Sequence, residues 1–214
     1  MEIRDRQNGF HYLHILTRNA VKQMKHIIID SMDSPLFKEV YDIIDGNFPY
    51  TEKRTYHDHI NAFKKFKNFN IEALADDSNK IIGVLTWWEF DDCIYGEHLA
   101  IVDGCKGQGY GKIMQGRMQS IAESFEKPFI FEIEPPCSSP QAKRRLDFYL
   151  RGGFVLNEHI THFQPTYNMG DTPLEMNIMS YPVAITAEEY NRFKKQQTEV
   201  IESILKDSDY MACK

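Results

Sequence analysis

Apolar residues recur at every third or fourth position in two early segments, 36–44 and 52–66, and this spacing predicts two helices. Gly46 and Asn47 end the first of them. The pattern then changes to short apolar runs separated by turn residues such as those at 76–79, which is typical of consecutive antiparallel strands. We expect these strands at 71–75, 80–90 and 94–102, preceded by a short apolar strand that begins at Met24.

The second half of the chain alternates between helices and strands. A glycine-rich stretch at 103–111 follows the third strand of the meander, and the segment after it has helical spacing up to Phe125. The run 129–134 is apolar on both faces almost to its end, which favours a central strand. The remaining predicted elements are a helix that begins at Ser139, a strand at 154–156 and late strands near 162–167 and 174–180.

The last predicted helix has a clear start signal. Thr186 and Glu189 form a capping box, and Ile185 with Tyr190 forms a hydrophobic staple. Its apolar stripe needs a partner, which is either the rest of the domain or a second copy in a homodimer. The patterns together divide the chain into an N-terminal extension of 1–23, a domain of 24–182 and a C-terminal helical segment of 183–214.

Composition and charge exclude several classes of protein. Hydrophobic residues make up 42% of the chain, which is enough for one full core. The 25 basic and 31 acidic residues give a net charge of -6, which argues against a nucleic-acid partner held by a positive field over the whole domain. No apolar run approaches the roughly 20 residues needed to cross a bilayer, so no membrane partner is expected. The charged first residues also predict no secretion signal.

The cysteines and histidines suggest neither disulfides nor a metal. The pair His57 and His59 has no further ligands at helical spacing, so no metal site is predicted. Without a paired spacing or a regular framework, the cysteines favour reduced thiols and a cytoplasmic protein. They are Cys93, Cys105, Cys137 and Cys213.

The most informative stretch joins a strand to a helix at 94–125. Glycines at alternate positions let main-chain N–H groups point into one cavity, and the following helix adds the positive end of its dipole. Such a turn suits a pyrophosphate. A loop of the type Gly-x-x-x-x-Gly-Lys-Ser/Thr is excluded by Lys106 and Ile113, which stand where glycine and a hydroxyl residue are needed. The dinucleotide fingerprint Gly-x-Gly-x-x-Gly fails at Lys112 or at Met114, depending on where it starts.

Two other motifs resemble the GNAT superfamily of N-acetyltransferases. The family's motif A is an apolar strand, then Arg/Gln-x-x-Gly-x-Gly/Ala, then a helix. The chain has Leu99-Ala100-Ile101-Val102-Asp103-Gly104-Cys105-Lys106-Gly107-Gln108-Gly109-Tyr110-Gly111, with lysine where the family has Arg or Gln. Further along, Phe148-Tyr149-Leu150-Arg151-Gly152-Gly153-Phe154 resembles the family's motif B. The order of elements agrees with the family over roughly 24–182.

The resemblance implies a fold and a donor substrate. The fold is α+β (α/β/α), with a GNAT-like mixed, mostly antiparallel twisted sheet of six to seven strands, a splayed parallel pair, helices on both faces and an extra C-terminal helix. The acyl donor is acetyl-CoA, and no metal is implied. In the family the pantetheine arm of acetyl-CoA forms main-chain hydrogen bonds with an exposed strand edge, as an extended peptide would. By this resemblance Leu99, Ala100 and Ile101 bind the arm, and the pyrophosphate is held by the main-chain amides of Lys106, Gly107, Gln108, Gly109, Tyr110 and Gly111.

The implied reaction is direct transfer of the acetyl group to a primary amine in a ternary complex. Glu97 is the candidate general base, because it precedes the apolar stretch of motif A on the strand that faces the acceptor in the family. Its neighbour His98 points to the opposite face of a regular strand, and a β-bulge would exchange the two. Glu132 and Glu134 on the next strand are rival bases. Tyr149 of motif B is the candidate general acid for the CoA thiolate, or else a hydrogen-bond donor to its sulfur.

The acceptor amine stays open at this stage. The resemblance implies a pocket built from 48–52, 87–89 and 162–167, whose aromatic side chains and carboxylates suit a cation. A non-catalytic module that senses acyl-CoA is the second hypothesis, and a nucleotide-binding protein outside this family is the third. Catalysis, as opposed to sensing, requires that a carboxylate such as Glu97 and the hydroxyl of Tyr149 lie in one cleft.

Overall fold

The computed structural model describes residues 3–4, 10–14, 23–168 and 170–212, and the side chains of 24–168 and 170–206. Cys213 lies outside these residues, and so does most of the predicted extension 1–23. The helices are α1 (Pro35–Asn47), α2 (Tyr56–Lys65), α3 (Tyr110–Phe125), α4 (Pro140–Arg151) and α5 (Ala187–Ala212), with 3-10 turns η1 (Tyr50–Glu52) and η2 (Asp103–Cys105). The strands are β1 (Ile3–Arg4), β2 (Phe10–His14), β3 (Gln23–Ile28), β4 (Phe69–Ala75), β5 (Ile81–Glu89), β6 (Ile94–Ile101), β7 (Phe129–Ile133), β8 (Val155–Leu156), β9 (His162–Gln164) and β10 (Leu174–Tyr181).

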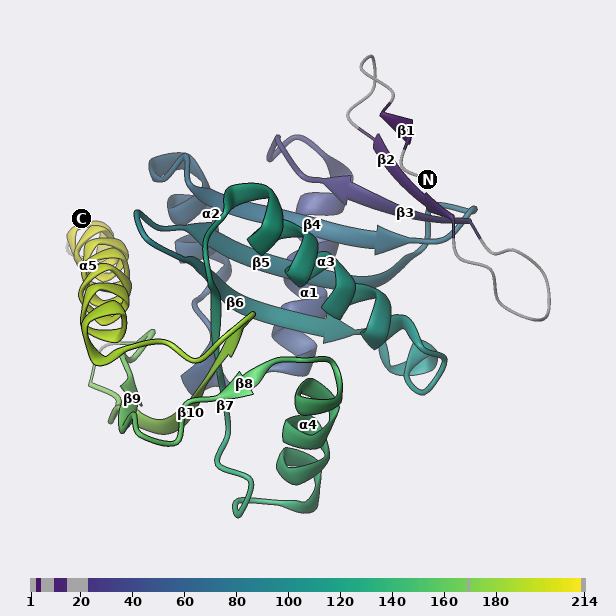
Figure 1. Cartoon of the computed structure of the whole chain (residues 1–214). Coiled ribbons are helices and arrows are strands. Elements are labelled where there is room, and N and C mark those ends of the chain that lie inside the picture. The colour runs from purple at the N-terminus through teal and green to yellow at the C-terminus, as the bar shows by residue number, and fades with distance from the viewer. Residues whose placement is uncertain (1–2, 5–9, 15–22, 169, 213–214) are drawn as a thin grey trace.

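One mixed sheet organises the fold (Figure 1). Its strand order is β1-β2-β3-β4-β5-β6-β7-β10-β8, and β9 pairs with β10 outside this path. The neighbouring strands are antiparallel except β6 and β7, which are parallel and joined through α3. The predicted mostly antiparallel sheet with one parallel pair is confirmed. The short strands β1 and β2 were not predicted, whereas β9 corresponds to the strand predicted near 162–167.

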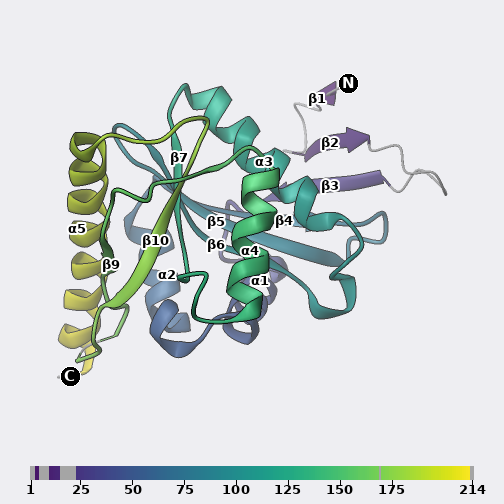
Figure 2. The ribbon, with the colours of Figure 1, turned by 60° about the horizontal axis from the view of Figure 1, so that its bottom comes forward.

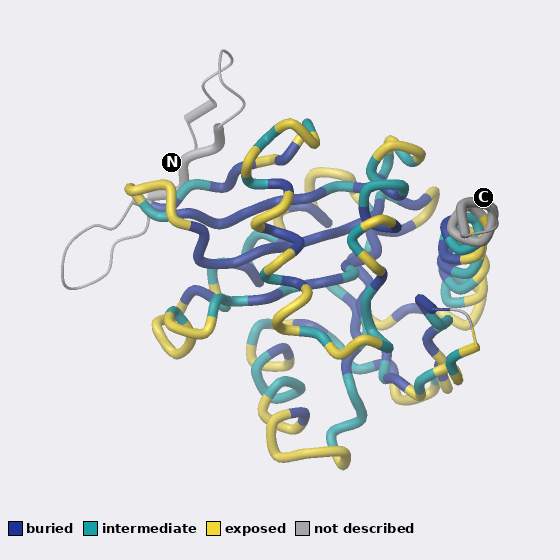
Figure 3. Tube along the Cα trace, turned by 180° about the vertical axis from the view of Figure 1, so that it is seen from behind, coloured by how far each residue is buried: buried dark blue, intermediate teal, exposed yellow. Residues whose placement is uncertain are grey.

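Helices cover both faces of the sheet, as predicted (Figure 2). On one face α1, α2 and α5 pack against the sheet, with Phe37, Trp88 and Phe193 among the buried residues of their shared core. On the other face α3 and α4 bury a second core that includes Met114, Phe131 and Tyr149. The central strands are therefore buried on both sides, while the connecting loops are exposed (Figure 3). Helix α5 packs on the domain, and the alternative of a homodimer contact stays a prediction.

The helix boundaries follow from local capping. The Ser34 hydroxyl accepts from the main-chain N–H of Leu36 and starts α1. The predicted second helix begins later than position 52, because Thr55 caps α2 and the preceding residues form η1. The capping box of α5 is confirmed, since Thr186 Oγ1 accepts from the amide of Glu189 while the Glu189 carboxylate accepts from the amide of Thr186. The connection between α1 and α2, at 48–55, contributes residues to the site described below.

Candidate functional site

The parallel strands β6 and β7 pair over a short distance and then separate. Pairing joins Ile94 to Phe129, Tyr95 to Ile130 and Gly96 to Phe131 in register, whereas β6 continues to Ile101 without β7 beside it. A cleft of about 190 Å³ opens there. Glycine is needed at the end of the paired stretch, because a Cβ on Gly96 would lie 2.3 Å from the ring of Phe129.

A β-bulge on β6 lies at the point of separation. His98 pairs with Thr86 and Gly96 pairs with Trp87, so Glu97 stands opposite no residue of β5. As a result, the side chains of Glu97 and His98 both contact the connection between α1 and α2, instead of lying on opposite faces as in a regular strand. Glu97 forms an ion pair with Arg54, and His98 Nε2 lies 3.0 Å from the main-chain oxygen of Glu52.

Many of the predicted site residues line this one cleft. The walls come from the turn after α1, the separated strands and α4. The lining residues include the predicted donor and catalytic residues Glu97, Leu99, Ala100, Ile101, Lys106 and Tyr149. They also include the rival bases Glu132 and Glu134, the neighbour His98, Phe48 and Glu52 of the predicted acceptor segment, and the unpredicted Phe131 and Arg145. The structure therefore brings the candidate base, the candidate acid and the candidate pantetheine strand together.

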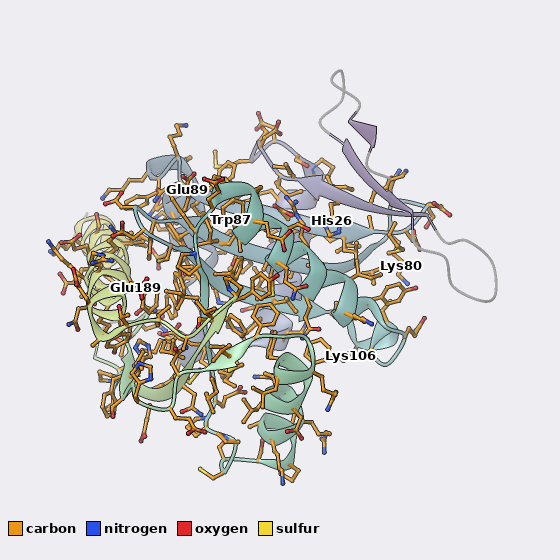
Figure 4. All side chains as sticks on the ribbon, viewed as in Figure 1. His26, Lys80, Trp87, Glu89, Lys106 and Glu189 are labelled. Carbon is orange, nitrogen blue, oxygen red and sulfur yellow. The ribbon has the colours of Figure 1, made fainter. Side chains whose placement is uncertain are left out.

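The glycine loop continues from Lys106, whose side chain is labelled beside it in Figure 4. Gly107 and Gly109 have φ of +76° and +89°, a left-handed conformation that favours glycine. The amides of Gly107, Gln108, Gly109 and Gly111 donate to no main-chain carbonyl of the described residues. A Cβ at Gly107 or Gly109 would meet no protein atom within 4 Å. The loop thus leaves main-chain donors and open space at the start of α3, an arrangement that fits a pyrophosphate.

Tyr149 lies in an aromatic cluster on the wall formed by α4. Its ring centroid is 4.5 Å from that of Phe131 and 5.6 Å from that of Phe154. Burial raises the pKa of Tyr149 to about 12, with the negative charge of Glu134 acting in the same direction and Arg145 against it. The phenol is therefore protonated at neutral pH and can act as a proton donor.

Glu97 is buried and ionised. Its side chain is 1% exposed and that of its partner Arg54 is 2% exposed. Burial acts to raise the pKa of the Glu97 carboxyl, but the positive charge of Arg54 and the interactions with His98 and Trp88 together outweigh burial and lower the pKa to about 2. Arg54 also lies over the rings of Phe69, Trp88 and Tyr167, at 5.2 to 5.5 Å from their centroids. The carboxylate is held in a fixed position rather than free in the cleft.

The other carboxylates of the cleft have different partners. Glu134 pairs with Arg145, and Glu132 pairs with His162. For Glu52, no ion-pair partner is present among the described side chains, and burial together with the charge of Glu134 raises its pKa. Glu52 is thus the carboxylate of this cleft that is best placed to receive a cation from solution.

Sequence reasoning missed Arg54 and Tyr95 of the site, and it placed Tyr167 and His162 in the acceptor segment 162–167 without giving either a role. Arg54 belongs to no sequence motif. The hydroxyl of Tyr95 contacts the carboxylate of Glu132, and the hydroxyl of Tyr167 contacts that of Glu97. His162 reaches Glu132 from β9. No local spacing connects these positions, so only their proximity in the folded chain reveals them.

Similar solved structures agree with this architecture. A candidate acetyltransferase of the GNAT family from Bacteroides thetaiotaomicron is 31% identical, with a TM-score of 0.69, and the match covers 79% of this chain and 94% of that one. Spermidine N-acetyltransferase from Vibrio cholerae, solved with CoA and spermine, has a TM-score of 0.54 at 10% identity over 72% of this chain and 94% of that one. The ribosomal-protein-S18-alanine N-acetyltransferase from Escherichia coli has a TM-score of 0.50 at 17% identity, over 76% and 97%. The last two show the fold alone.

The fold and the cleft are those of an acetyltransferase. At this level of identity and coverage, the chain belongs to the GNAT family. This membership supports acetyl transfer as the general activity and decides against a nucleotide-binding protein outside the family. No family model and no curated protein matches the chain.

Two further observations concern metals and membranes. Among the described residues, no group of three or more His, Cys, Asp or Glu side chains is placed to hold a metal ion. Each helix in the described part of the chain is too short or too polar to span a bilayer. Cys93, Cys105 and Cys137 are free thiols, and the cytoplasmic location inferred from the cysteines stays a prediction.

Proposed function

We propose that this protein transfers the acetyl group of acetyl-CoA to a primary amine by direct attack in a ternary complex. The observation that carries the proposal is the cleft between the separated strands β6 and β7. Glu97 and Tyr149 line it together, and the glycine loop adjoins it at Lys106. The candidate base, the candidate acid and the glycine loop are thus within one site.

In this proposal the donor binds mainly through the main chain. Beyond Gly96, the edge of β6 that faces β7 has no strand partner among the described residues, so Leu99, Ala100 and Ile101 are free to accept the pantetheine arm as an added strand. The amides from Lys106 to Gly111 hold the pyrophosphate. Because Gly107 and Gly109 carry no Cβ, phosphate oxygens can approach these amides closely.

The chemistry requires that the acceptor nitrogen lose two protons and that the CoA sulfur gain one. The acceptor ammonium loses a proton, by way of Glu97 or a water next to it, and the resulting amine attacks the thioester carbonyl carbon. A main-chain N–H near Leu99–Ile101 stabilises the oxyanion of the tetrahedral intermediate. The carbon–sulfur bond then breaks, and the CoA thiolate takes the phenolic proton of Tyr149. The former ammonium nitrogen loses its second proton, and this proton restores the phenol of Tyr149, directly or through water. The amide product, CoA and one released proton balance the reaction.

The acceptor is a cationic primary amine that enters at the α1–α2 connection. Glu52 supplies a carboxylate there with no ion-pair partner among the described side chains, and Phe48 lines the cleft beside it. A carboxylate next to an aromatic ring suits an ammonium group. The raised pKa of Glu52 also lets it share or accept a proton at the entrance.

The second candidate function is sensing of acyl-CoA without turnover. It is favoured by the ion pair of Glu97 with Arg54, because a carboxylate with a pKa of about 2 and a 1% exposed side chain is a weak base. Both functions share the same donor site, and they differ only in whether a thiol is released.

The deciding experiment measures thiol release from acetyl-CoA across a panel of primary amines, together with the rise in melting temperature that acetyl-CoA causes. Catalysis predicts both, whereas sensing predicts the thermal shift alone. Tyr149→Phe should lower kcat by about ten-fold to a hundred-fold while the acetyl-CoA thermal shift is kept. Tyr181→Phe is the matched control, since its hydroxyl bonds Glu123 on the surface. An unchanged kcat in Tyr149→Phe would remove the acid role.

A further inference from the structure

Two tyrosine hydroxyls bridge two buried carboxylates where β6 and β7 separate. The hydroxyl of Tyr167 donates to Glu97 Oε1 at 3.2 Å, and the hydroxyl of Tyr95 donates to Glu132 Oε2 at 2.7 Å. The two hydroxyl oxygens are 3.2 Å apart. All four side chains are almost wholly buried, with exposed fractions of 1% for Tyr95 and 3% for Tyr167. The bridge is therefore a continuous chain of oxygens with little access to water.

This bridge is one proton short when both carboxylates are ionised. It has three oxygen–oxygen contacts, and the two hydroxyls supply two hydrogens. If both hydroxyls donate outward, no hydrogen lies between the tyrosine oxygens. One added proton fills every contact, and it can do so in two ways. It is attached to Glu97 with all hydrogens directed toward Glu132, or to Glu132 with all hydrogens directed toward Glu97.

We propose that Tyr167 and Tyr95 relay the proton of the acceptor amine from Glu97 to Glu132. Glu97 passes its proton to the oxygen of Tyr167, Tyr167 passes its own to Tyr95, and Tyr95 passes its own to Glu132 Oε2. Three O–H bonds break and three form, so one proton moves and no oxidation occurs. The inference rests on the proposed function, in which Glu97 is the first group to take the proton.

The surroundings of the two ends give the relay a direction. Arg54 favours the ionised form of Glu97, so Glu97 does not retain a proton. At the other end, His162 Nε2 and Gln197 Nε2 contact Glu132 Oε1, the latter at 2.9 Å. His162 Nδ1 lies 3.0 Å from the hydroxyl of the partly exposed Tyr190. The proton can thus leave through His162 and Tyr190, and α5 supplies the last part of the route.

The pH dependence of the relay involves groups from several elements. The titratable and charged groups that face Glu97 are Arg54 before α2, His59 on α2, His98 on β6 and Tyr167. Those that face Glu132 are Tyr95 on β6, His162 on β9, Tyr190 and Lys194 on α5, and Glu52 on η1.

The test compares Tyr95→Phe, Tyr167→Phe and the double variant, using the full chain, acetyl-CoA and an amine found in the thiol-release screen. Each single variant should lower kcat by at least about ten-fold, as expected for loss of a proton-transfer group, while KM for acetyl-CoA stays unchanged. The double variant should be no slower than the slower single variant, because a relay is interrupted by one break. The pH profile of kcat and the solvent deuterium isotope effect should change in the same variants.

Tyr41→Phe is the matched control. Tyr41 is 7% exposed and its hydroxyl donates to the main-chain oxygen of Arg54, so the change removes a buried hydroxyl outside the bridge. It should keep kcat and the isotope effect. Glu132→Gln keeps the shape of the relay's end without its proton-accepting charge, and it should show the same fall in kcat even if a tyrosine variant does not fold.

The outcomes separate the relay from the proposed function. Wild-type turnover with unchanged kcat in folded bridge variants overturns the relay alone. The relay is also overturned if the fold-loss in kcat of the double variant equals the product of the two single losses, because the two tyrosines would then act independently. A wild-type protein that binds acetyl-CoA but releases no thiol with any amine overturns the proposed function instead.

Discussion

The two ends of the cleft are built from different parts of the chain. At the glycine loop, the groups proposed to bind the donor are main-chain amides on exposed residues such as Gly107 and Gln108. At the bulge of β6, the site consists of buried side chains contributed by separate elements, among them Arg54, Glu97 and Tyr167. A main-chain site is specified by a few adjacent residues, whereas a side-chain site depends on the whole fold to bring its members together.

The two ends also differ in what they contribute to stability. An exposed loop amide is hydrated before a ligand arrives, so leaving it unpaired costs little. A buried charge has lost its water and must have a partner. The fold is therefore much more sensitive to substitutions at the buried end than at the loop, and three sets of variants measure this contrast.

The largest effect is expected from Arg54→Met. It leaves the carboxylate of Glu97 buried without its partner, so the free energy of unfolding at pH 7 should fall by about 3–5 kcal/mol in urea titrations. Arg145→Met is the control, because the Arg145–Glu134 pair is 36% and 29% exposed and should contribute only about 0–1 kcal/mol. Equal losses in the two variants would contradict the contrast between the two ends.

A smaller effect is expected from pH at the same buried end. Burial lowers the pKa of His59 to about 3, and the charge of Arg54 acts in the same direction. The unfolded chain, with an ordinary histidine pKa of about 6.5, binds the proton more readily than the folded one. Stability is thus complete above pH 6.5 and is lost as pH falls toward 3, by about 2 kcal/mol at pH 5.

His59→Phe should remove this part of the acid sensitivity, as measured by urea unfolding at pH 7 and pH 5. The aromatic neighbours Phe37, Tyr41 and Phe69 already pack against the His59 ring, so a phenyl group suits the site. His57 is exposed, and His57→Phe should leave the difference between the two pH values as in the wild type. If His59→Phe loses as much stability between pH 7 and pH 5 as the wild type does, His59 is not a cause of the acid sensitivity.

The contrast also explains what the sequence could predict. The spacing of glycines after β6 and the aromatic motif ending at Phe154 are local, so they revealed the family, the loop and the cleft. The bulge was foreseen only as an alternative, because alternation along β6 gives no sign of an extra residue at Glu97. The pairing of Arg54 with Glu97, and of Glu132 with His162, joins positions far apart in the chain. Such contacts depend on tertiary packing and leave no periodic signal.

The smallest effect on stability is expected at the loop. Gly109 has a φ of +89°, where a side chain is strained, so Gly109→Ala should lower the free energy of unfolding by about 1 kcal/mol. Gly116 lies inside α3 and, like Gly109, has open space for a Cβ; Gly116→Ala should raise stability by up to about 1 kcal/mol. The added methyl group at position 109 lies beside the amides proposed to hold the pyrophosphate, so this variant alone should weaken acetyl-CoA binding in calorimetry. Unchanged affinity in Gly109→Ala would place the pyrophosphate elsewhere, and the glycine loop would then not be the donor-binding end of the cleft.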